Sequence, residues 1–536
     1  MRKNKRSFLP VTIMSLMLFW GLSLQPAGAQ SSEDQTSDST NQAAPLKDLD
    51  TYIHKVMKRW QVPGLAIAVV KDGKVVLSKG YGVRELGKPG KVDANTLFTI
   101  GSNSKAFTAA ALGTLVSAGK LTWDAPVTNY VKDFKLSNPY VTQHITLRDL
   151  LTHRSGYSDP FMKYTSDVKD AIKRLRYQKP DYDFRTRFSY NNSMYWVASR
   201  FIPSVTGESW NNYTEEHLFK PLNMTRTVTT QAGLAATGNV AKPHGMVDGK
   251  LQVIHEIWSH NADIEAPAGY INSSARDMSH WLLMLLNNGR YGGKTVLAPS
   301  VVRDMETPQV LIHSGASGVR FVSPDSHFYA YGMGFFIEDY GGHKLVWHTG
   351  DVAGMISALA LVPDEHLGVV VLTNLNGNDP FGVLFHVLQS YLGLPPRDLD
   401  KIVYAGMHKI IQHARAEAKK LADTRQPDSK LPHPLTVYAG NYKDNFNGKA
   451  DVSIEKNHLV LRLGNPDFTG DLKHWHDNTF RVTWRDRFYD SDVLNAGVAY
   501  VTFDLDAYGK PVKLSFAKWP LHFKRVKEAK STAEAK

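Results

Sequence analysis

The sequence predicts an α/β protein, with one sheet built from the two ends of a main domain, residues 47–395, and helices between them. A separate all-β domain is predicted at 435–526. The main domain is predicted from apolar strand pairs near both its ends, VPGLAIAVVKDGKVVLSKGYG and MISALALVPDEHLGVVVLTNL, with helical periodicity between them. The second domain is predicted because short alternating segments, separated by turn residues, begin at Leu435, a texture typical of a small barrel or sandwich.

The first residues have the features of an export signal. A basic start, MRKNKR, precedes the apolar stretch Phe8–Leu24, and Ala27-Gly28-Ala29 is a small-x-small cleavage site. Residues 1–29 are therefore predicted to be a signal peptide cut after Ala29, which makes the protein periplasmic or secreted. The alternative is an uncleaved membrane anchor, because the apolar stretch is long for a signal peptide.

The segment 30–46 is predicted to be a disordered leader, because SSEDQTSDSTNQAAP contains no bulky apolar residue. In the main domain, Asp72-Gly73 has the composition of a tight hairpin turn between the first two strands. Apolar residues then recur every four positions from Phe107 to Leu115 and predict a helix. Further helical segments run to about Asn288, and the last two strands flank Pro363-Asp364.

A helix, PFGVLFHVLQSYLG, closes the main domain, and residues 396–434 are predicted to form a helical linker that prolines break near its end. The all-β domain follows, and 527–536 is predicted to be a disordered tail. After the signal peptide no segment offers about 18 uninterrupted apolar residues, so no further membrane span is expected.

Composition excludes several kinds of function. The chain has no cysteine, which rules out disulfides, a thiol nucleophile and cysteine metal sites. His255 and His260 are five residues apart and would diverge by about 140° on a helix, so neither a metal site nor a cofactor is expected. The formal net charge of +12 is spread along the chain, so no nucleic-acid partner is expected, while an anionic envelope polymer stays open as a partner.

The stretch GSNSKAFTAA places Ser102 and Lys105 in an S-x-x-K pattern at the start of the helix predicted after residue 101. Residues three apart share a helix face, so the amine can reach the hydroxyl and activate it as a nucleophile if burial lowers the pKa of the lysine. Four other S-x-x-K matches begin at Ser117, Ser166, Ser453 and Ser515. They lie at a helix end, in a polar stretch or in predicted strands.

Two further patterns agree with a serine nucleophile. RFSYNNSMYW contains Tyr190 and Asn192, a phenol that can relay a proton and an amide that can hold a substrate carbonyl. LVWHTGDVAG places His348, Thr349 and Gly350 directly before an apolar strand, a position typical of an edge whose backbone pairs with substrate.

These three patterns, in this order, resemble the serine β-lactamase and penicillin-binding-protein superfamily. The most similar branch is the class C-like group of D-aminopeptidases, DD-peptidases and family VIII esterases, and the resemblance covers about 48–395. It extends to ITLRDLLTHRSGY and APAGYINSSARDMSHWL. It implies an antiparallel sheet flanked by helices, together with a helical subdomain. The segment from YAGNY to VKLSF resembles the lipocalin-like C-terminal domain of some such peptidases.

The resemblance assigns the catalytic roles. Ser102 is the acylated nucleophile, Lys105 activates it, and Tyr190 carries protons to the leaving group and from the deacylating water. Which of Lys105 and Tyr190 is the general base stays open. Asn192 orients the substrate, His348, Thr349 and Gly350 line it, and the backbone N–H groups of Ser102 and Asp351 form the oxyanion hole.

Two positions depart from the pattern of many penicillin-recognising members. His348 stands where they have lysine, and an imidazole that is mostly neutral at pH 7 and charged below about pH 6 holds a carboxylate less well. Asp351 replaces a smaller residue and would repel an anionic substrate. Both departures weaken a β-lactamase assignment.

The sequence therefore predicts an exported serine hydrolase, first as a peptidase or amidase on peptides that contain D-amino acids or resemble peptidoglycan. A family VIII-type carboxylesterase, a β-lactamase, and a peptide or cell-wall sensor that is acylated without turnover are the alternatives. The expected partners are small peptide, amide or ester substrates, with peptidoglycan as a candidate. The sequence predicts neither the natural substrate nor the oligomeric state.

Overall fold

The computed structural model describes residues 45–159, 168–254, 262–313, 326–378, 380–426, 428–465, 468–491, 499–517, 519 and 521–526. The predicted signal peptide, the predicted C-terminal tail and nearly all of the predicted leader lie outside the described residues, as do His255 and His260. Within the described part of the chain, no helix combines the length and the apolar character needed to cross a bilayer.

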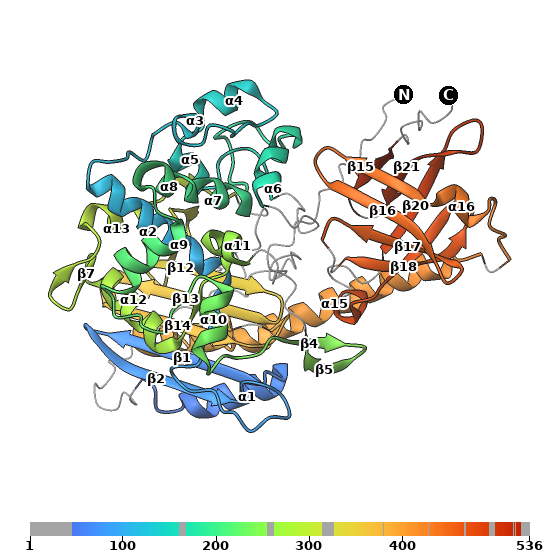
Figure 1. The fold of residues 1–536 in the computed structure, drawn as a ribbon. Helices are drawn as coiled ribbons and strands as arrows, with labels where there is room; N and C mark the ends of the chain where they lie inside the picture. Colours follow the sequence, from blue (N-terminus) through green and yellow to red (C-terminus); the bar gives the residue numbers. More distant parts are fainter. Residues whose placement is uncertain are drawn as a thin grey trace, which may run out of the picture.

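An antiparallel eight-stranded sheet, in the order β2-β1-β14-β13-β12-β11-β10-β9, forms the centre of the main domain (Figure 1). The first and last parts of the domain meet in it, because Leu65 lies opposite Thr373. The prediction of one sheet built from distant segments is confirmed. The strands are β1 (Gly64–Lys71), β2 (Lys74–Gly82), β9 (Val310–Leu311), β10 (Tyr329–Tyr331), β11 (Phe336–Tyr340), β12 (His343–Val352), β13 (Met355–Val362) and β14 (Leu367–Thr373).

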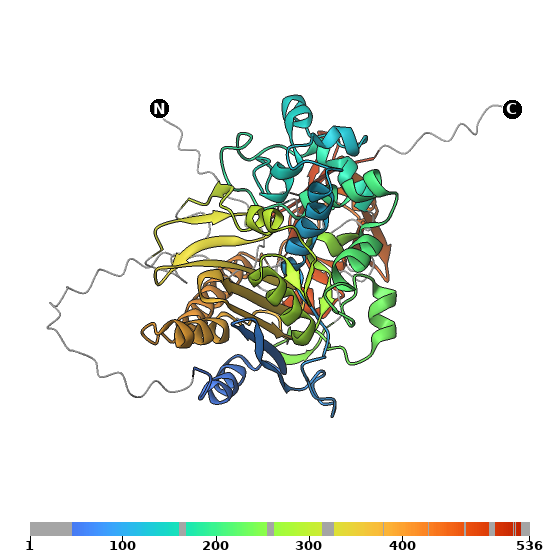
Figure 2. The ribbon, with the colours of Figure 1, turned by 90° about the vertical axis from the view of Figure 1, so that its left-hand side faces the viewer.

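Helices cover both faces of this sheet (Figure 2). Alternate side chains of β1 point to opposite faces. Leu65 and Ile67 pack with α1 (Leu49–Trp60) and α14 (Phe381–Leu392), whereas Ala66 and Ala68 pack with α2 (Ser104–Ser117) and α12 (Ala275–Leu286). Small residues on the second face leave room for these helices.

The other helices of the main domain are α3 (Val127–Tyr130), α4 (Pro139–His144), α5 (Leu147–Leu151), α6 (Val168–Arg174), α7 (Asn192–Ser199), α8 (Phe201–Thr206), α9 (Trp210–Thr214), α10 (Gln231–Thr237), α11 (Ala262–Gly269) and α13 (Pro299–Met305). Short strand pairs join them: β3 (Phe98–Thr99) with β6 (Asn272–Ser273), β4 (His244–Val247) with β5 (Lys250–Val253), and β7 (Arg290–Tyr291) with β8 (Lys294–Thr295).

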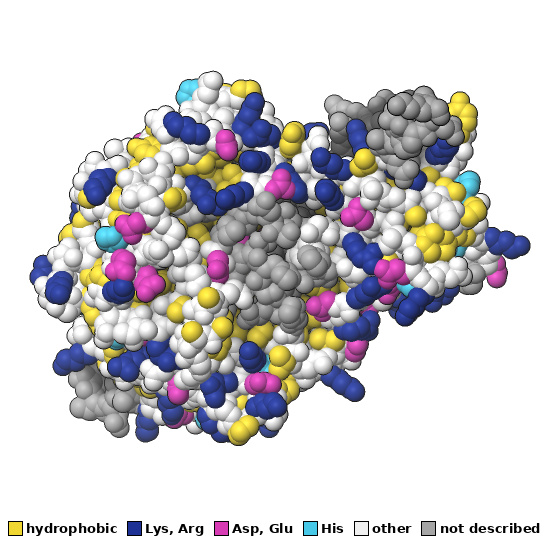
Figure 3. Space-filling model, viewed as in Figure 1, with side chains coloured by type: hydrophobic (Ala, Val, Ile, Leu, Met, Phe, Trp, Pro, Cys, Tyr) yellow, Lys and Arg dark blue, Asp and Glu magenta, His cyan; other side chains and the backbone are white. Residues whose placement is uncertain are grey.

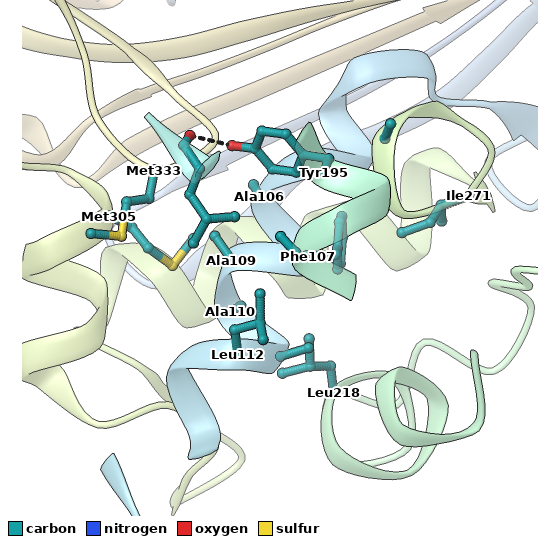
Figure 4. Close-up of a cluster of buried hydrophobic side chains, with 14 of the residues drawn as sticks. Ala106, Phe107, Ala109, Ala110, Leu112, Tyr195, Leu218, Ile271, Met305 and Met333 are labelled. Atoms are coloured by element: carbon teal, nitrogen blue, oxygen red, sulfur yellow. Dashed lines mark hydrogen bonds between the residues drawn. The ribbon is translucent and has the colours of Figure 1, made fainter. Parts of the chain in front are cut away.

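The helix α2 runs through the interior of the domain. Every residue from Ser104 to Gly113 is buried, and Figure 4 shows Ala106, Phe107 and Ala109 packed among side chains of neighbouring elements, including Tyr195 and Met333. A helix that is apolar on all sides belongs in a core. Any polar side chain near the start of α2 is therefore held away from bulk water.

The linker helix α15 (Leu399–Asp423) leads to the second domain, a closed barrel in which each strand pairs with the next and β15 pairs with β22. This up-and-down closure is also that of lipocalins. Its strands are β15 (Gly440–Asp444), β16 (Gly448–Glu455), β17 (His458–Leu463), β18 (Thr469–His476), β19 (Thr479–Trp484), β20 (Ala499–Leu505), β21 (Pro511–Phe516) and β22 (His522–Arg525). The alternating segments predicted from Leu435 onward begin instead at Gly440, because Leu435–Tyr438 forms the short helix α16.

The barrel contacts the main domain through α17 (Arg487–Ser491) and through the turn between β15 and β16, where Phe446 packs against the main domain's apolar cluster. Val247 and Ile254, from the β4–β5 hairpin, join the barrel's apolar cluster beside Phe488. Arg487 forms an ion pair with Asp248. Charged side chains of both signs are interspersed over the face of the molecule in Figure 3, and Lys and Arg do not gather into one patch there.

Candidate active site

The site is built where the short helix η1 (Gly101–Asn103) runs into α2. Gly101 has φ +56°, and a Cβ atom there would lie 2.4 Å from the backbone nitrogen of Asp351. Only glycine combines this left-handed backbone with such a close approach. The turn presents Ser102 one helical turn before Lys105, and the two side chains meet with Nζ 2.9 Å from Oγ.

Lys105 is fully buried, and the surrounding polar groups satisfy its amine. Its Nζ contacts Ser102 Oγ, donates to Asn192 Oδ1 at 2.6 Å, and donates to the carbonyl oxygen of Ala268 at 2.7 Å. Burial lowers the pKa of Lys105 to about 7, although the charge of Asp159 acts in the opposite direction. A lysine with this pKa is partly a free amine at neutral pH and can accept a proton.

Tyr190 reaches the same hydroxyl from the other side. Its OH donates to Ser102 Oγ at 2.7 Å, and Lys105 Nζ lies 4.8 Å from the centre of its ring. Burial raises the pKa of Tyr190 well above its usual range. The phenol is therefore protonated at rest and able to donate. Ser102 Oγ has a proton-transfer partner on each side.

Asn192 begins α7, and its amide is oriented by Asp159, a residue that the sequence analysis did not select. Asp159 Oδ1 accepts the backbone N–H of Asn192 at 2.9 Å, and Oδ2 accepts its Nδ2 at 2.8 Å. These bonds leave Asn192 Oδ1 facing Lys105. Burial raises the pKa of the Asp159 carboxyl to about 6. The only sequence signal was its place just after HRSGY, a block noted for the resemblance.

The end of β12 passes directly beside η1. Strand β11 accompanies β12 as far as Trp347, which lies opposite Phe336, and His348–Val352 continues beyond it, paired with β13. A Cβ atom on Gly350 would lie 1.8 Å from the carbonyl oxygen of Ile100, so the two backbones touch. This contact places the Asp351 backbone nitrogen beside Gly101, next to the nucleophile.

Ser357, on β13, holds the turn that carries Ser102 against the sheet. Asn103 Nδ2 donates to Ser357 Oγ at 2.7 Å, and Ser357 Oγ donates to the Ile100 carbonyl at 2.6 Å. Both bonds are buried. They link β13 to the turn that carries Ser102.

His348 lies behind the partly exposed Thr349 and is itself only 1% exposed. Its Nδ1 donates to the carbonyl oxygen of Thr349 at 2.5 Å, so Nε2 accepts the hydroxyl of Tyr331 at 3.1 Å. Burial, reinforced by the nearby Lys105 charge, lowers the pKa of His348 to about 3. The expectation that this imidazole charges below pH 6 is wrong, because the sequence pattern does not show how deeply the side chain is buried.

The structure therefore brings Lys105, Tyr190 and Asn192 together around Ser102, with the Asp351 backbone nitrogen beside Gly101, while the His348 side chain is buried behind Thr349. Within the described ranges, no group of three or more His, Asp or Glu side chains is arranged to hold a metal ion.

An antiparallel sheet flanked by helices, with a serine and a buried lysine at the start of the central helix, defines the class of β-lactamase and transpeptidase-like serine hydrolases. A family model described as Beta-lactamase matches residues 49–389, and the chain belongs to that family. A second model, a domain of unknown function (DUF3471), matches residues 424–529, the region of the barrel.

Among curated relatives, the unguisins hydrolase ungD of Aspergillus violaceofuscus is 29% identical over 77% of this chain and 78% of its own length. Protein flp of Staphylococcus aureus is 27% identical over 64% of each chain. The octameric penicillin-binding protein homologue from Pyrococcus abyssi has a TM-score of 0.58 at 22% identity and covers 89% of this chain and 99% of that one. SurE, solved with D-Leu, has a TM-score of 0.51 at 18% identity over 90% of this chain and 99% of its own.

Proposed function

We propose that this serine hydrolase acts through an acyl-enzyme on Ser102 and cleaves amide bonds in peptides that contain D-amino acids or resemble peptidoglycan. The observation that carries the mechanism is the meeting of Lys105 Nζ and Tyr190 OH on one hydroxyl oxygen, at 2.9 and 2.7 Å. The signal-like first 29 residues support a periplasmic or secreted location.

Acylation begins when the Ser102 proton passes to the Lys105–Tyr190 pair, and Oγ then attacks the substrate carbonyl carbon. The N–H groups of Ser102 and Asp351 bind the oxyanion. As the C–N bond breaks, Tyr190 gives a proton to the leaving amine and is reprotonated through Lys105. A water molecule then attacks the acyl carbon and passes its proton to the same pair, which returns a proton to Ser102 Oγ as the acyl C–Oγ bond breaks.

The charges around the site favour a peptide over a β-lactam. His348 is neutral, so β12 presents no cation there for a substrate carboxylate. Asp159 adds an acidic group next to Asn192, whereas burial raises the pKa of Glu265 on α11 to about 8, so that carboxyl is uncharged at neutral pH. An anionic substrate is disfavoured in such surroundings, whereas a neutral or amine-bearing one is not. The curated relative named for hydrolysis of unguisins agrees with an enzyme that turns over its substrate.

Intact-mass analysis after treatment with a fluorophosphonate tests the nucleophile. One adduct is expected on the wild type and on Ser117→Ala, an exposed S-x-x-K serine at the end of the same helix, and none on Ser102→Ala. An adduct that persists in Ser102→Ala contradicts the mechanism.

Hydrolysis of matched L- and D-aminoacyl amides, short acyl esters and a chromogenic cephalosporin tests the substrate class. Turnover of the D-aminoacyl amides supports the proposal. Turnover of esters alone assigns an esterase, efficient cephalosporin turnover assigns a β-lactamase, and stoichiometric acylation without turnover assigns a sensor.

A further inference from the structure

The loop after α5 contains a buried histidine in an unusual backbone conformation. His153 is fully buried and has φ +56°, in the left-handed region where glycine or asparagine usually follows a helix. A non-glycine residue held there indicates a constraint imposed by its surroundings. The His153 side chain is therefore expected to have a role that glycine could not fill at this position.

Two hydrogen bonds connect His153 to the residues on either side of Tyr190. The His153 carbonyl oxygen accepts the N–H of Ser189 at 2.7 Å, and its Nδ1 accepts the N–H of Asn191 at 3.0 Å. His153 thus holds the backbone on both sides of Tyr190, although Asn191 lies 38 residues away from His153 in the sequence.

The imidazole also contacts the phenol itself. The centres of the His153 and Tyr190 rings are 4.3 Å apart, and the planes are tilted by 35°. Tyr331 and Tyr195 pack against other parts of the imidazole, with ring centres at 4.9 and 5.3 Å. The Tyr190 ring can therefore rotate or slide little without displacing His153.

The bond from Asn191 requires an uncharged imidazole, because a protonated ring has no acceptor nitrogen. Burial, followed by the charge of Lys105, holds the pKa of His153 well below its usual value. With Nδ1 accepting, the proton lies on Nε2, which has no hydrogen-bond partner in the described part of the chain. The ring thus serves as a neutral acceptor and a packing surface.

We propose that His153 is a positioning residue that holds Tyr190 in place for proton transfer with Ser102. The inference rests on the proposed function, since it concerns the same hydroxyl. Misplacing a catalytic group by about 1 Å can cost about 10²-fold in rate. Loss of the contacts between His153 and the Tyr190 segment should therefore lower kcat while substrate binding changes little.

Two substitutions distinguish the contribution of the His153 hydrogen-bond acceptor from that of its aromatic ring. In His153→Phe the aromatic packing stays but the acceptor is lost. In His153→Asn the side-chain oxygen can accept from Asn191, and asparagine tolerates a positive φ. His153→Gly fits the backbone with no side chain and serves if the phenylalanine variant does not fold. His366, an exposed histidine with φ 47°, provides matched control substitutions.

The experiment measures kcat and KM for a p-nitrophenyl ester, together with thermal unfolding. We expect His153→Phe to lower kcat by about 10- to 100-fold, with KM within about two-fold, and His153→Asn to recover most of the loss. In a Tyr190→Phe background, His153→Phe should cost less than about two-fold more, because its effect passes through the phenol. The same substitutions at His366 should change nothing.

The inference is overturned if folded His153→Asn is as slow as His153→Phe, if folded His153→Phe has wild-type kcat, or if its full loss persists without the Tyr190 hydroxyl. If neither the phenylalanine nor the glycine variant folds, kcat of folded His153→Asn decides alone. Fluorophosphonate labelling of the wild type separates the two proposals. Failure to label Ser102 rejects the proposed function, whereas normal turnover in the His153 variants rejects only the positioning role of His153.

Discussion

Lys105 shows how opposing electrostatic effects set the chemistry of one side chain. Burial in α2 favours the neutral amine, and the charge of Asp159 favours the ammonium; the balance leaves a pKa of about 7. A group whose pKa lies near neutrality can exchange protons in both directions during a reaction. The same residue in an exposed helix would stay charged.

The pH dependence of kcat/KM should follow this group. Activity is expected to rise through about pH 7 as Lys105 loses its proton. Asp159→Asn removes the negative charge that favours the ammonium, so the pKa of Lys105 falls and the acid limb moves to lower pH. Asp364→Asn, an exposed change elsewhere, should leave the limb in place. An upward shift in Asp159→Asn would contradict this account.

Lys105 and Tyr190 should behave as one proton-transfer unit. Lys105→Ala and Tyr190→Phe are each expected to lower kcat by about 10²–10⁴-fold, the usual range for acid–base groups. Because both act on Ser102 Oγ, the double variant should lose little beyond the worse single change. Losses that multiply in steady-state kinetics would show independent roles.

His348 should not act as a pH switch. With a pKa of about 3 it stays neutral from about pH 8 to pH 5, so the ratio of cephalosporin to uncharged-ester kcat/KM should stay flat over this range. The ratio cancels the titration of Lys105, which affects both substrates. An increase in the ratio below about pH 6 would mean that the imidazole gains a charge and holds the substrate carboxylate.

At the scale of elements, the site depends on contact between the end of β12 and η1. The two backbones touch at Gly350 and Ile100, and Ser357 on β13, the strand paired with β12, donates to the Ile100 carbonyl oxygen. The oxyanion donors come from these two elements, so their separation sets the proposed oxyanion hole. A side chain cannot be inserted between them without moving one.

Gly350→Ala should separate these elements. Its Cβ atom would lie 1.8 Å from the Ile100 carbonyl oxygen. Overpacking of this kind typically costs roughly 1–3 kcal/mol in the free energy of unfolding, and a displacement of about 1 Å should slow ester turnover by about 10²-fold. Gly90→Ala is the control, because there the new atom meets only the flexible end of Arg84. Denaturant unfolding and ester kinetics measure both effects; an unchanged kcat in Gly350→Ala would contradict the proposed geometry.

The elements that the sequence predicted best are those with strong local signals. The hairpin at Asp72-Gly73, the strands around Pro363-Asp364 and the helix after Ser102 are confirmed because apolar periodicity and turn residues act over a few positions. The short strands β9–β11 have no such pattern. Asp159 and His153 were not selected because their roles arise from contacts with Asn192 and Tyr190, more than 30 residues away.

At the scale of the whole molecule, the barrel lies against the C-terminal end of β12, the strand expected to line the substrate. Ala353, in the turn after β12, packs against the barrel's apolar cluster two residues beyond Asp351. Figure 1 shows the β4–β5 hairpin extending from the main domain toward the barrel. The hairpin contacts α17, where Val247 joins the cluster that contains Phe488. A long substrate that continues past Asp351 would approach this junction. We therefore expect the barrel to restrict substrate length without taking part in the chemistry.

A larger side chain at the interface, in the full-length protein, tests this role of the barrel better than removal of the barrel, which would expose Val247 and Ile254. A Cβ atom on Gly245 would lie 2.7 Å from the Phe488 ring, so Gly245→Val should loosen the docking while both domains stay folded. Ser102 and its partners lie away from Gly245, and changes at distant sites have nearly independent effects. We therefore expect kcat/KM of Gly245→Val for a small ester to stay within about two-fold of the wild-type value.

The ratio of kcat/KM for a longer D-peptide amide to that for a single D-aminoacyl amide should instead rise in Gly245→Val, because the obstacle beyond Asp351 moves away. Met246→Val, at the neighbouring position of the same strand, points to the opposite face and should leave the ratio unchanged. The surface pair Arg487–Asp248 is half exposed and contributes little, so its removal alone should not reproduce the effect. If Gly245→Val loosens the barrel, as limited proteolysis would show, and the length preference stays the same, the barrel does not control substrate access.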